Sequence, residues 1–168
     1  MKTLYLGRHA KSSWDYSELS DFERPLNNRG RKDTPLMGNV FNEMNLMPDL
    51  IISSPALRAC FTARIIAEKI GYPLEEIETS EIIYEGDSSD LIELIKSIDD
   101  EINSLMIFGH NPTLTIASNY FCEKRIGNIP TCGLVAIEFD INSWEEIDAV
   151  KGRQLFFEYP KKHLDKKL

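Results

Sequence analysis

An α/β fold around a mainly parallel central sheet is the architecture that this sequence predicts. Short apolar runs typical of buried strands alternate along the chain with segments whose apolar residues recur at helical spacing. No internal repeat, low-complexity linker or shift in composition divides the 168 residues. We therefore expect one domain, 1–168, large enough to form a core without disulfides or metals.

The first strand is expected at residues 3–7, directly after the N-terminal methionine. A polar loop over 11–29 follows, and it is longer than a structural connection requires, which is typical of functional loops. A helix is predicted from about Gly30 to Asn45, although Pro35 and Gly38 leave its first turns uncertain.

The second strand is predicted at 49–53. Ser54 and Pro55 then have the pattern of an N-cap and a first-turn proline, opening a helix that runs to Ile70 and stops at Gly71.

The second half of the chain continues the alternation of strands and helices. A third strand is expected at 77–83, an amphipathic helix at 89–102 and a fourth strand at 104–108, followed by a helix with Asn111 as its cap. The last two strands are expected at 133–139 and 153–159, alternating enough to lie antiparallel at an edge. The lysine-rich tail, 160–168, is expected to be frayed.

Composition excludes several classes of function. The net charge of -8 argues against a general nucleic-acid or anionic-membrane surface. No signal-peptide pattern and no apolar run of membrane-spanning length is present, so a cytoplasmic protein is expected. The three cysteines, Cys60, Cys122 and Cys132, show no CxxC spacing, which favours small buried side chains over a metal site.

The distribution of charge singles out the N-terminal region. Residues 1–35 carry seven Lys/Arg against five Asp/Glu, whereas residues 71–105 carry eleven Asp/Glu against one lysine. An acidic protein that keeps its positive charge near Arg8 and His9 is expected to have a local anion site there.

Three predicted strand ends carry cationic or nucleophilic side chains. Arg8 and His9 follow the first strand, Arg58 lies early in the helix after the second, and His110 follows the fourth. Because the carboxyl ends of parallel strands share one edge of a sheet, where open α/β sheets bind ligands, these side chains are expected to converge. Helix N-termini at the same edge would add free N–H groups.

This combination of residue types suits phosphate chemistry. Guanidinium groups match a phosphate in charge and geometry. One histidine can attack phosphorus as a neutral imidazole while the second stabilises the transition state, and water then releases phosphate. No metal is required if the arginines supply the positive charge. Each residue alone has an ordinary structural explanation, such as capping or a surface ion pair, and only the joint arrangement favours a site.

Three motifs carry a family resemblance. Leu6–Ser12 (LGRHAKS) resembles the RHG/RHA motif of the histidine phosphatase superfamily, the phosphoglycerate mutase-like proteins. Ser53–Ala63 and Phe108–Pro112 resemble its second and third motifs. Together with Asp21–Gly30, these segments are most similar to the SixA-type phosphohistidine phosphatases, and the resemblance covers roughly residues 1–120.

The resemblance implies a three-layer α/β/α sandwich and a metal-independent phosphatase without a cofactor. His9 matches the nucleophile that becomes transiently phosphorylated, and Arg8, Arg58 and His110 match the residues of the phosphate pocket. The short chain, without a large insertion or cap, resembles the SixA type more than the mutases.

The sequence does not decide which residue acts as the general acid. Glu81 lies where larger members carry an acidic residue, and Glu85 is the second candidate. A carboxylate of the first loop, Asp15, Asp21 or Glu23, or no acid at all, are the alternatives. A phosphate ester needs an acid because an alkoxide leaves poorly, whereas the imidazole of phosphohistidine can leave as a neutral ring.

Four further residues of the first loop are weaker candidates. Ser12 and Asn27 are candidates for hydrogen bonds to phosphate, or for satisfying turns. Trp14 and Tyr16 are candidates for the rim of the site, or for packing anchors.

The sequence favours hydrolysis of a phosphohistidine carried by a partner protein, through an intermediate on His9. The alternatives are a phosphatase for small phosphorylated metabolites and, ranked last, a non-catalytic module that binds a phospho-ligand.

Overall fold

A six-stranded sheet in the order β3-β2-β4-β1-β5-β6 forms the centre of the computed structural model, which describes residues 1–164. The strands are β1 (Lys2–Arg8), β2 (Leu50–Ser53), β3 (Glu78–Thr79), β4 (Ser104–Gly109), β5 (Leu134–Phe139) and β6 (Arg153–Glu158). The neighbours among β1 to β4 pair in parallel, whereas β5 pairs antiparallel with β1 and β6 pairs antiparallel with β5 at the edge. The mainly parallel sheet is confirmed.

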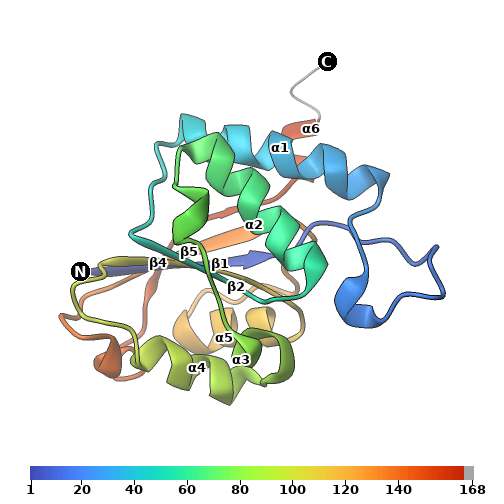
Figure 1. Cartoon of the computed structure of the whole chain (residues 1–168). Helices are drawn as coiled ribbons and strands as arrows, with labels where there is room; N and C mark the ends of the chain where they lie inside the picture. The colour runs from blue at the N-terminus through green and yellow to red at the C-terminus, as the bar shows by residue number, and fades with distance from the viewer. Residues whose placement is uncertain (165–168) are drawn as a thin grey trace.

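Helices cover both faces of the sheet, which makes the three layers visible in Figure 1. Helices α1 (Asn28–Glu43) and α2 (Leu57–Ile70) lie on one face. Helices α3 (Glu81–Glu85), α4 (Ser88–Lys96) and α5 (Thr113–Phe121) lie on the other. Short 3₁₀ turns occur at Asp21–Glu23, Leu74–Glu76 and Trp144–Glu146.

The alternating side chains of the central strands divide between two cores. In β4, Leu105 and Ile107 belong to the core under α4 and α5, whereas Met106 and Phe108 belong to the core under α1 and α2. This follows from the two-residue period of a strand. Each such side chain contributes about 1.5–3 kcal/mol when fully buried, so burial on both faces fixes the register of the strand.

That register brings several chain segments to one edge of the sheet. Arg8 at the end of β1 pairs with Gly109 at the end of β4, and Ser53 at the end of β2 pairs with Phe108. Because β5 runs the opposite way, its first residue, Leu134, pairs with Gly7 at the same edge.

The third predicted strand is largely wrong. Only Glu78 and Thr79 pair with β2, and the chain then forms helix α3, so the strand expected at 77–83 ends four residues early. Strand β2 itself ends at Ser53, opposite Thr79, and its last bond to this segment runs from the Ser80 N–H to the Ser53 carbonyl at 3.0 Å. The side chain of Ile83 is buried against Gly109. A Cβ atom added to Gly109 would lie only 2.9 Å from the Cγ2 atom of Ile83, so this contact requires a glycine.

Several helix boundaries also differ from the prediction. Helix α2 begins at Leu57 with Ala56 as its N-cap, so Ser54 is not the cap. Helix α5 begins at Thr113 after Pro112, although the Asn111 side chain still accepts from the Thr115 N–H at 3.2 Å.

Helix α4 ends at Lys96 rather than at residue 102. The segment expected to be frayed, 160–168, contains a helical turn, α6 (Lys161–Leu164), and residues 165–168 lie outside the described residues. Within the described residues, none of the helices is both long and apolar enough to span a membrane.

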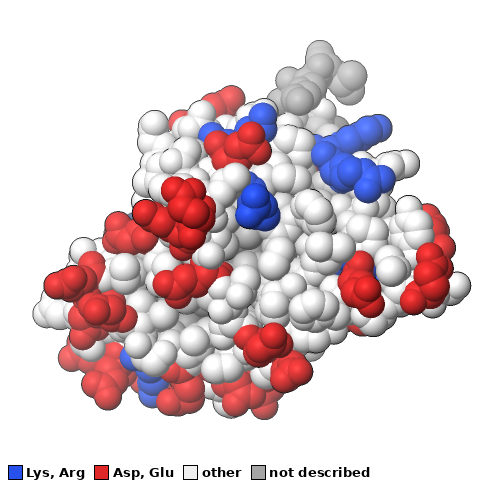
Figure 2. Space-filling view, viewed as in Figure 1, with Lys and Arg blue, Asp and Glu red and all other residues white. Residues whose placement is uncertain are grey.

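The surface charge follows the asymmetry seen in the sequence. Figure 2 shows acidic side chains over α3, α4 and the adjoining loops, and basic side chains gathered over the start of α1.

Candidate active site

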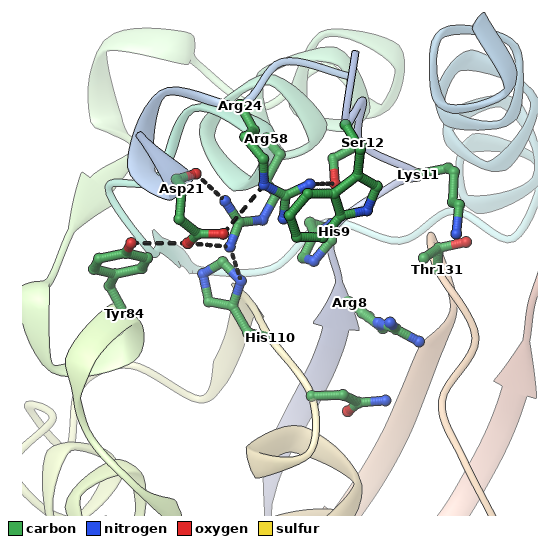
Figure 3. A pocket seen from close by; sticks show the side chains of 12 residues that line it. Arg8, His9, Lys11, Ser12, Asp21, Arg24, Arg58, Tyr84, His110 and Thr131 are labelled. Carbon is green, nitrogen blue, oxygen red and sulfur yellow. Dashed lines mark hydrogen bonds and ion pairs between the residues drawn. The ribbon is translucent and has the colours of Figure 1, made fainter. Parts of the chain in front are cut away.

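A pocket of about 430 Å³ opens at the carboxyl edge of the parallel strands. Figure 3 shows side chains from three strand ends and from the first loop pointing into it. The lining residues are Arg8, His9, Lys11, Ser12, Trp14, Asp21, Arg24, Arg58, Tyr84, His110, Asn111 and Thr131. The four residues expected to converge, Arg8, His9, Arg58 and His110, lie together here.

His9 is buried directly after β1, with only 8% of its surface exposed. Its ring Nδ1 lies 2.7 Å from the Ala10 carbonyl oxygen. A carbonyl only accepts, so Nδ1 carries the proton and Nε2 keeps its lone pair. Burial, opposed by this hydrogen bond and assisted by the charge of Arg58 and Arg8, lowers the pKa of His9 to about 3. The ring is therefore a neutral imidazole near neutral pH.

Two arginines carry buried donors that the described residues leave unpaired. Arg8 donates from Nη1 to the Ile129 carbonyl at 3.0 Å, but its Nε is buried and unbonded. Arg58, in the first turn of α2, is 5% exposed, and its Nε is also buried and unbonded within residues 1–164. Buried donors are normally paired, so these two suit an anionic ligand in the pocket.

His110 lies between Ser54 and Arg58. Its Nδ1 is 3.4 Å from Arg58 Nη2, which can only donate, so Nδ1 accepts and Nε2 carries the hydrogen. Nε2 then donates to Ser54 Oγ at 2.8 Å. Burial and the charge of Arg58 lower the pKa of His110 to about 4, and its ring centroid is 5.2 Å from that of His9.

A carboxylate, Asp21, joins the two sides of the pocket. Its Oδ2 accepts from Arg58 Nη2 at 3.0 Å and from the Tyr84 hydroxyl at 2.9 Å, and its Oδ1 accepts from Arg24 Nε at 3.1 Å. Burial raises the pKa of Asp21, but the bonds from Tyr84, Arg58 and Arg24 outweigh it and lower the pKa to about 2.

Arg24 connects this carboxylate to the rim. The guanidinium donates from Nη1 to Ser12 Oγ at 2.7 Å and lies 3.6 Å from the centre of the Trp14 ring. Ser12, a candidate for binding phosphate, therefore lines the pocket, and its hydroxyl oxygen accepts a hydrogen bond from Arg24. Trp14 is 74% exposed at the rim.

Six predicted candidates are not among the residues that line the pocket: Glu81, Glu85, Asn27, Asp15, Tyr16 and Glu23. Glu81 and Glu85 are exposed on α3 and line a different hollow of the surface. Asn27 is the N-cap of α1, where its Oδ1 accepts from the Gly30 N–H at 2.9 Å. It lines a second hollow together with Asp15 and Tyr16.

Tyr84 is a lining residue that the sequence did not assign, although it lies three residues after the candidate Glu81. Lys11, Arg24, Asn111 and Thr131 were not assigned to the site either. The first three lie within segments that carry the family resemblance, but Thr131 precedes β5, and nothing in its sequence neighbourhood signals the site. Within residues 1–164, no three His, Cys, Asp or Glu side chains gather closely enough to hold a metal ion.

Comparisons with known proteins place this geometry in a family. The model of the histidine phosphatase superfamily (branch 1) matches residues 4–91. An uncharacterized protein of Mycobacterium tuberculosis is 30% identical, covering 92% of this chain and 99% of its own length. An uncharacterized chloroplastic protein of Arabidopsis thaliana is 28% identical over 90% of this chain and 72% of its own.

Solved structures of SixA proteins have the same fold as this chain. A protein assigned as the phosphohistidine phosphatase SixA of Agrobacterium tumefaciens superposes with a TM-score of 0.80 at 26% identity, covering 95% of this chain and 98% of the other. A SixA protein histidine phosphatase complexed with tungstate also gives 0.80, at 19% identity and the same coverage, which shows the shared fold. The chain therefore belongs to the histidine phosphatase superfamily (branch 1), with a SixA-like structure, and is a phosphatase.

Proposed function

We propose that the chain hydrolyses phosphohistidine on a partner protein, without a metal, through a phosphorylated His9. The observation that carries this proposal is the state of His9, a buried and neutral imidazole whose Nε2 lone pair is free beside two arginines. A nucleophile that needs no deprotonation suits attack on phosphorus at neutral pH.

The arginines supply the binding charge in this proposal. A phosphoryl group between Arg8 and Arg58 gains partners for two buried Nε donors, and paired guanidinium donors match its oxygens. The added negative charge favours protonation of His110 at Nδ1, which then donates to a phosphoryl oxygen. Stabilising the transition state by fixed cations is the role that a metal ion has in other phosphatases.

The chemistry proceeds in two displacements. The Nε2 lone pair of His9 bonds to phosphorus, and the P–N bond of the substrate breaks with its electron pair going to the leaving nitrogen. If the other nitrogen of that ring carries a proton, the ring leaves as neutral imidazole. Water then attacks phosphorus, the electron pair of the new P–N bond returns to His9, and inorganic phosphate leaves with both protons of the water, one of which passes to solvent near neutral pH.

The absence of a poised acid favours P–N over P–O substrates. Asp21 is the carboxylate among the described lining residues, and with a pKa of about 2 it is ionised and cannot protonate an alkoxide. Glu81 and Glu85 lie elsewhere. An ester substrate would lack the general acid that its leaving group needs, so the phosphatase for small monoesters is the weaker candidate.

The experiment measures turnover of a phosphohistidine protein and of p-nitrophenyl phosphate by the wild type, His9→Ala and His163→Ala. His163 is a matched control because it lies on α6 and bonds Glu158 outside the pocket. We expect faster turnover of phosphohistidine, loss of both activities in His9→Ala, and wild-type rates in His163→Ala. Full turnover by His9→Ala would contradict the proposed nucleophile.

A covalent intermediate is tested by rapid mixing with radiolabelled substrate. The wild type is expected to carry label that survives alkali and is lost in acid, as a P–N bond does, and His9→Ala is expected to carry none. Equal labelling of both proteins would place the phosphoryl group on another residue.

A further inference from the structure

Asp21 is an anion in a pocket built for an anion. Its carboxylate is held by Arg58, Arg24 and Tyr84, and its backbone carbonyl accepts from Arg58 Nη1 at 2.6 Å. A fixed negative charge beside Arg58 repels an incoming phosphoryl group and weakens its binding. Holding Arg58 in place explains part of this arrangement, but an asparagine would provide an acceptor without the repulsion.

The exposure of Asp21 points to a second role. Half of its side chain is accessible, whereas the arginine that it binds is 6% accessible. A carboxylate oxygen can accept two hydrogen bonds, and Oδ1 accepts one, from Arg24 Nε. Within residues 1–164, one acceptor position on Oδ1 therefore has no partner, on a half-exposed side chain that lines the pocket.

Two aromatic residues lie beside the groups that hold this carboxylate. The Trp14 ring lies over Arg24, and the Tyr84 ring, which bonds Oδ2, lies 5.6 Å from the ring of His110. Figure 3 shows Asp21 and Tyr84 on one side of the pocket, with Arg24 between Asp21 and Ser12. A flat ring that enters with its phosphoryl group toward His9 would lie near these aromatic side chains and present its far edge to Asp21.

We propose that Asp21 accepts a hydrogen bond from the remote N–H of the substrate's protonated imidazole, so that the site selects phosphoryl groups carried on a cationic nitrogen. This inference rests on the proposed function and specifies the state in which phosphohistidine binds. Asp21 takes up no proton. It stabilises the imidazolium form of the bound ring, from which P–N cleavage delivers a neutral imidazole rather than an imidazolate anion.

The proposal separates two kinds of substrate. A protonated phosphoimidazole gains a charge-assisted bond to Asp21, whereas an aryl or alkyl phosphate carries no cation and meets only repulsion. It also predicts a pH effect, because a neighbouring anion raises the pKa of the bound imidazolium. Turnover of phosphoimidazole then persists to higher pH than it would without the carboxylate.

The test compares the wild type, Asp21→Asn and the control Asp15→Asn on phosphoimidazole and p-nitrophenyl phosphate. Asp15 belongs to the same loop but lines the neighbouring hollow. In Asp21→Asn we expect kcat/KM for phosphoimidazole, relative to that for the ester, to fall about 10-fold or more, the effect of one charge-assisted hydrogen bond. In the same variant, Asp21→Asn, the fall of kcat for phosphoimidazole at alkaline pH should begin at a lower pH than in the wild type.

The control Asp15→Asn should change neither the ratio of the two kcat/KM values nor the pH at which kcat falls.

Displacement of Arg58 would lower kcat/KM for both substrates, because both need that arginine. The ratio of the two kcat/KM values is therefore insensitive to such a displacement. An equal fall on both substrates, with the alkaline limb unmoved, would overturn the inference and leave the proposed function standing. A wild type that turns over the ester but not phosphoimidazole would overturn the proposed function and this inference with it.

Discussion

Ser54 and His110, 56 residues apart in the sequence, are joined by a 2.8 Å hydrogen bond between Oγ and Nε2. Ser54 follows β2 and His110 follows β4, and these strands are neighbours in the sheet. The bond fixes which nitrogen of His110 carries hydrogen, and so turns Nδ1 toward Arg58 and the pocket. The serine of the second sequence motif thus orients the histidine of the third.

Substituting Ser54 by alanine is expected to impair catalysis more than binding. Without the hydroxyl, Nε2–H of His110 loses its acceptor and the ring loses its fixed orientation, so we expect kcat to fall about 10-fold, as for loss of one hydrogen bond. KM should change little because Arg8 and Arg58 remain. Steady-state kinetics with Ser97→Ala, a change at an exposed serine on the far end of α4, provides the control. A kcat equal to that of the wild type would contradict this role.

Stability is expected to decrease as the pH falls below about 6.5, the pKa of an unfolded histidine. The folded pKa of His9 is about 3 and that of His110 about 4. Between these values and 6.5 the unfolded chain binds more protons than the folded chain, so the free energy of unfolding falls with falling pH. His9 alone should account for about 2 kcal/mol between pH 6.5 and 4.5.

Urea unfolding at several pH values measures this dependence. Protonation of Asp21 also lowers the free energy of unfolding. Because the folded pKa of Asp21 is about 2, this loss of stability occurs at lower pH, near and below the ordinary pKa of an aspartate. In His9→Gln, the free energy of unfolding should change clearly less between pH 6.5 and 4.5 than it does in the wild type. An unchanged slope would mean that His9 is not held neutral by burial.

Replacing Glu81 by glutamine is expected to leave both activities unchanged. The side chain is exposed at the start of α3 and lines a hollow other than the pocket. Turnover of a phosphohistidine protein and of p-nitrophenyl phosphate should stay within about 2-fold of the wild type, the range of a surface change without a role. A selective collapse of ester hydrolysis would restore Glu81 as the general acid.

The position of Glu81 outside the pocket shows where sequence reasoning reached its limit. Strand ends could be located from apolar runs, and parallel pairing alone then brings Arg8, Arg58 and His110 to one edge. The segment after β3 has no such constraint, because its helix depends on where β2 stops and on the burial of Ile83. Both are tertiary facts, so whether Glu81 or Tyr84 reaches the pocket could not be derived from local pattern.

The first loop illustrates the same limit. Its length indicated function, but the roles of Asp21 and Arg24 arise from contacts with Arg58 on α2 and Trp14 at the rim. Such contacts join residues with no periodic relationship in the sequence. By contrast, Asn27 caps α1 through a local hydrogen bond to the Gly30 N–H, whereas the alternative drawn from the sequence was a residue that satisfies a turn.

Removal of divalent metals is expected to leave activity intact. Arg8 and Arg58 supply the positive charge that the transition state needs, and His9 is neutral without a metal-bound base. Turnover after dialysis against EDTA, and again after adding back Mg²⁺ or Zn²⁺, should match the untreated enzyme. Activity that is lost on dialysis and restored by a metal would contradict a metal-independent mechanism.

The geometry of the Arg58 guanidinium is expected to matter as much as its charge. Nη1 and Nη2 bond the Asp21 carbonyl and carboxylate at 2.6 and 3.0 Å, and only the fork of an arginine satisfies both while leaving Nε for a phosphoryl oxygen. Arg58→Lys keeps the charge but loses this pairing, so we expect kcat/KM to fall about 100-fold on both substrates, as for loss of two charge-assisted bonds. Arg64→Lys, an exposed change on the same helix, should have no effect. Near-normal activity of Arg58→Lys would mean that charge alone holds the phosphoryl group.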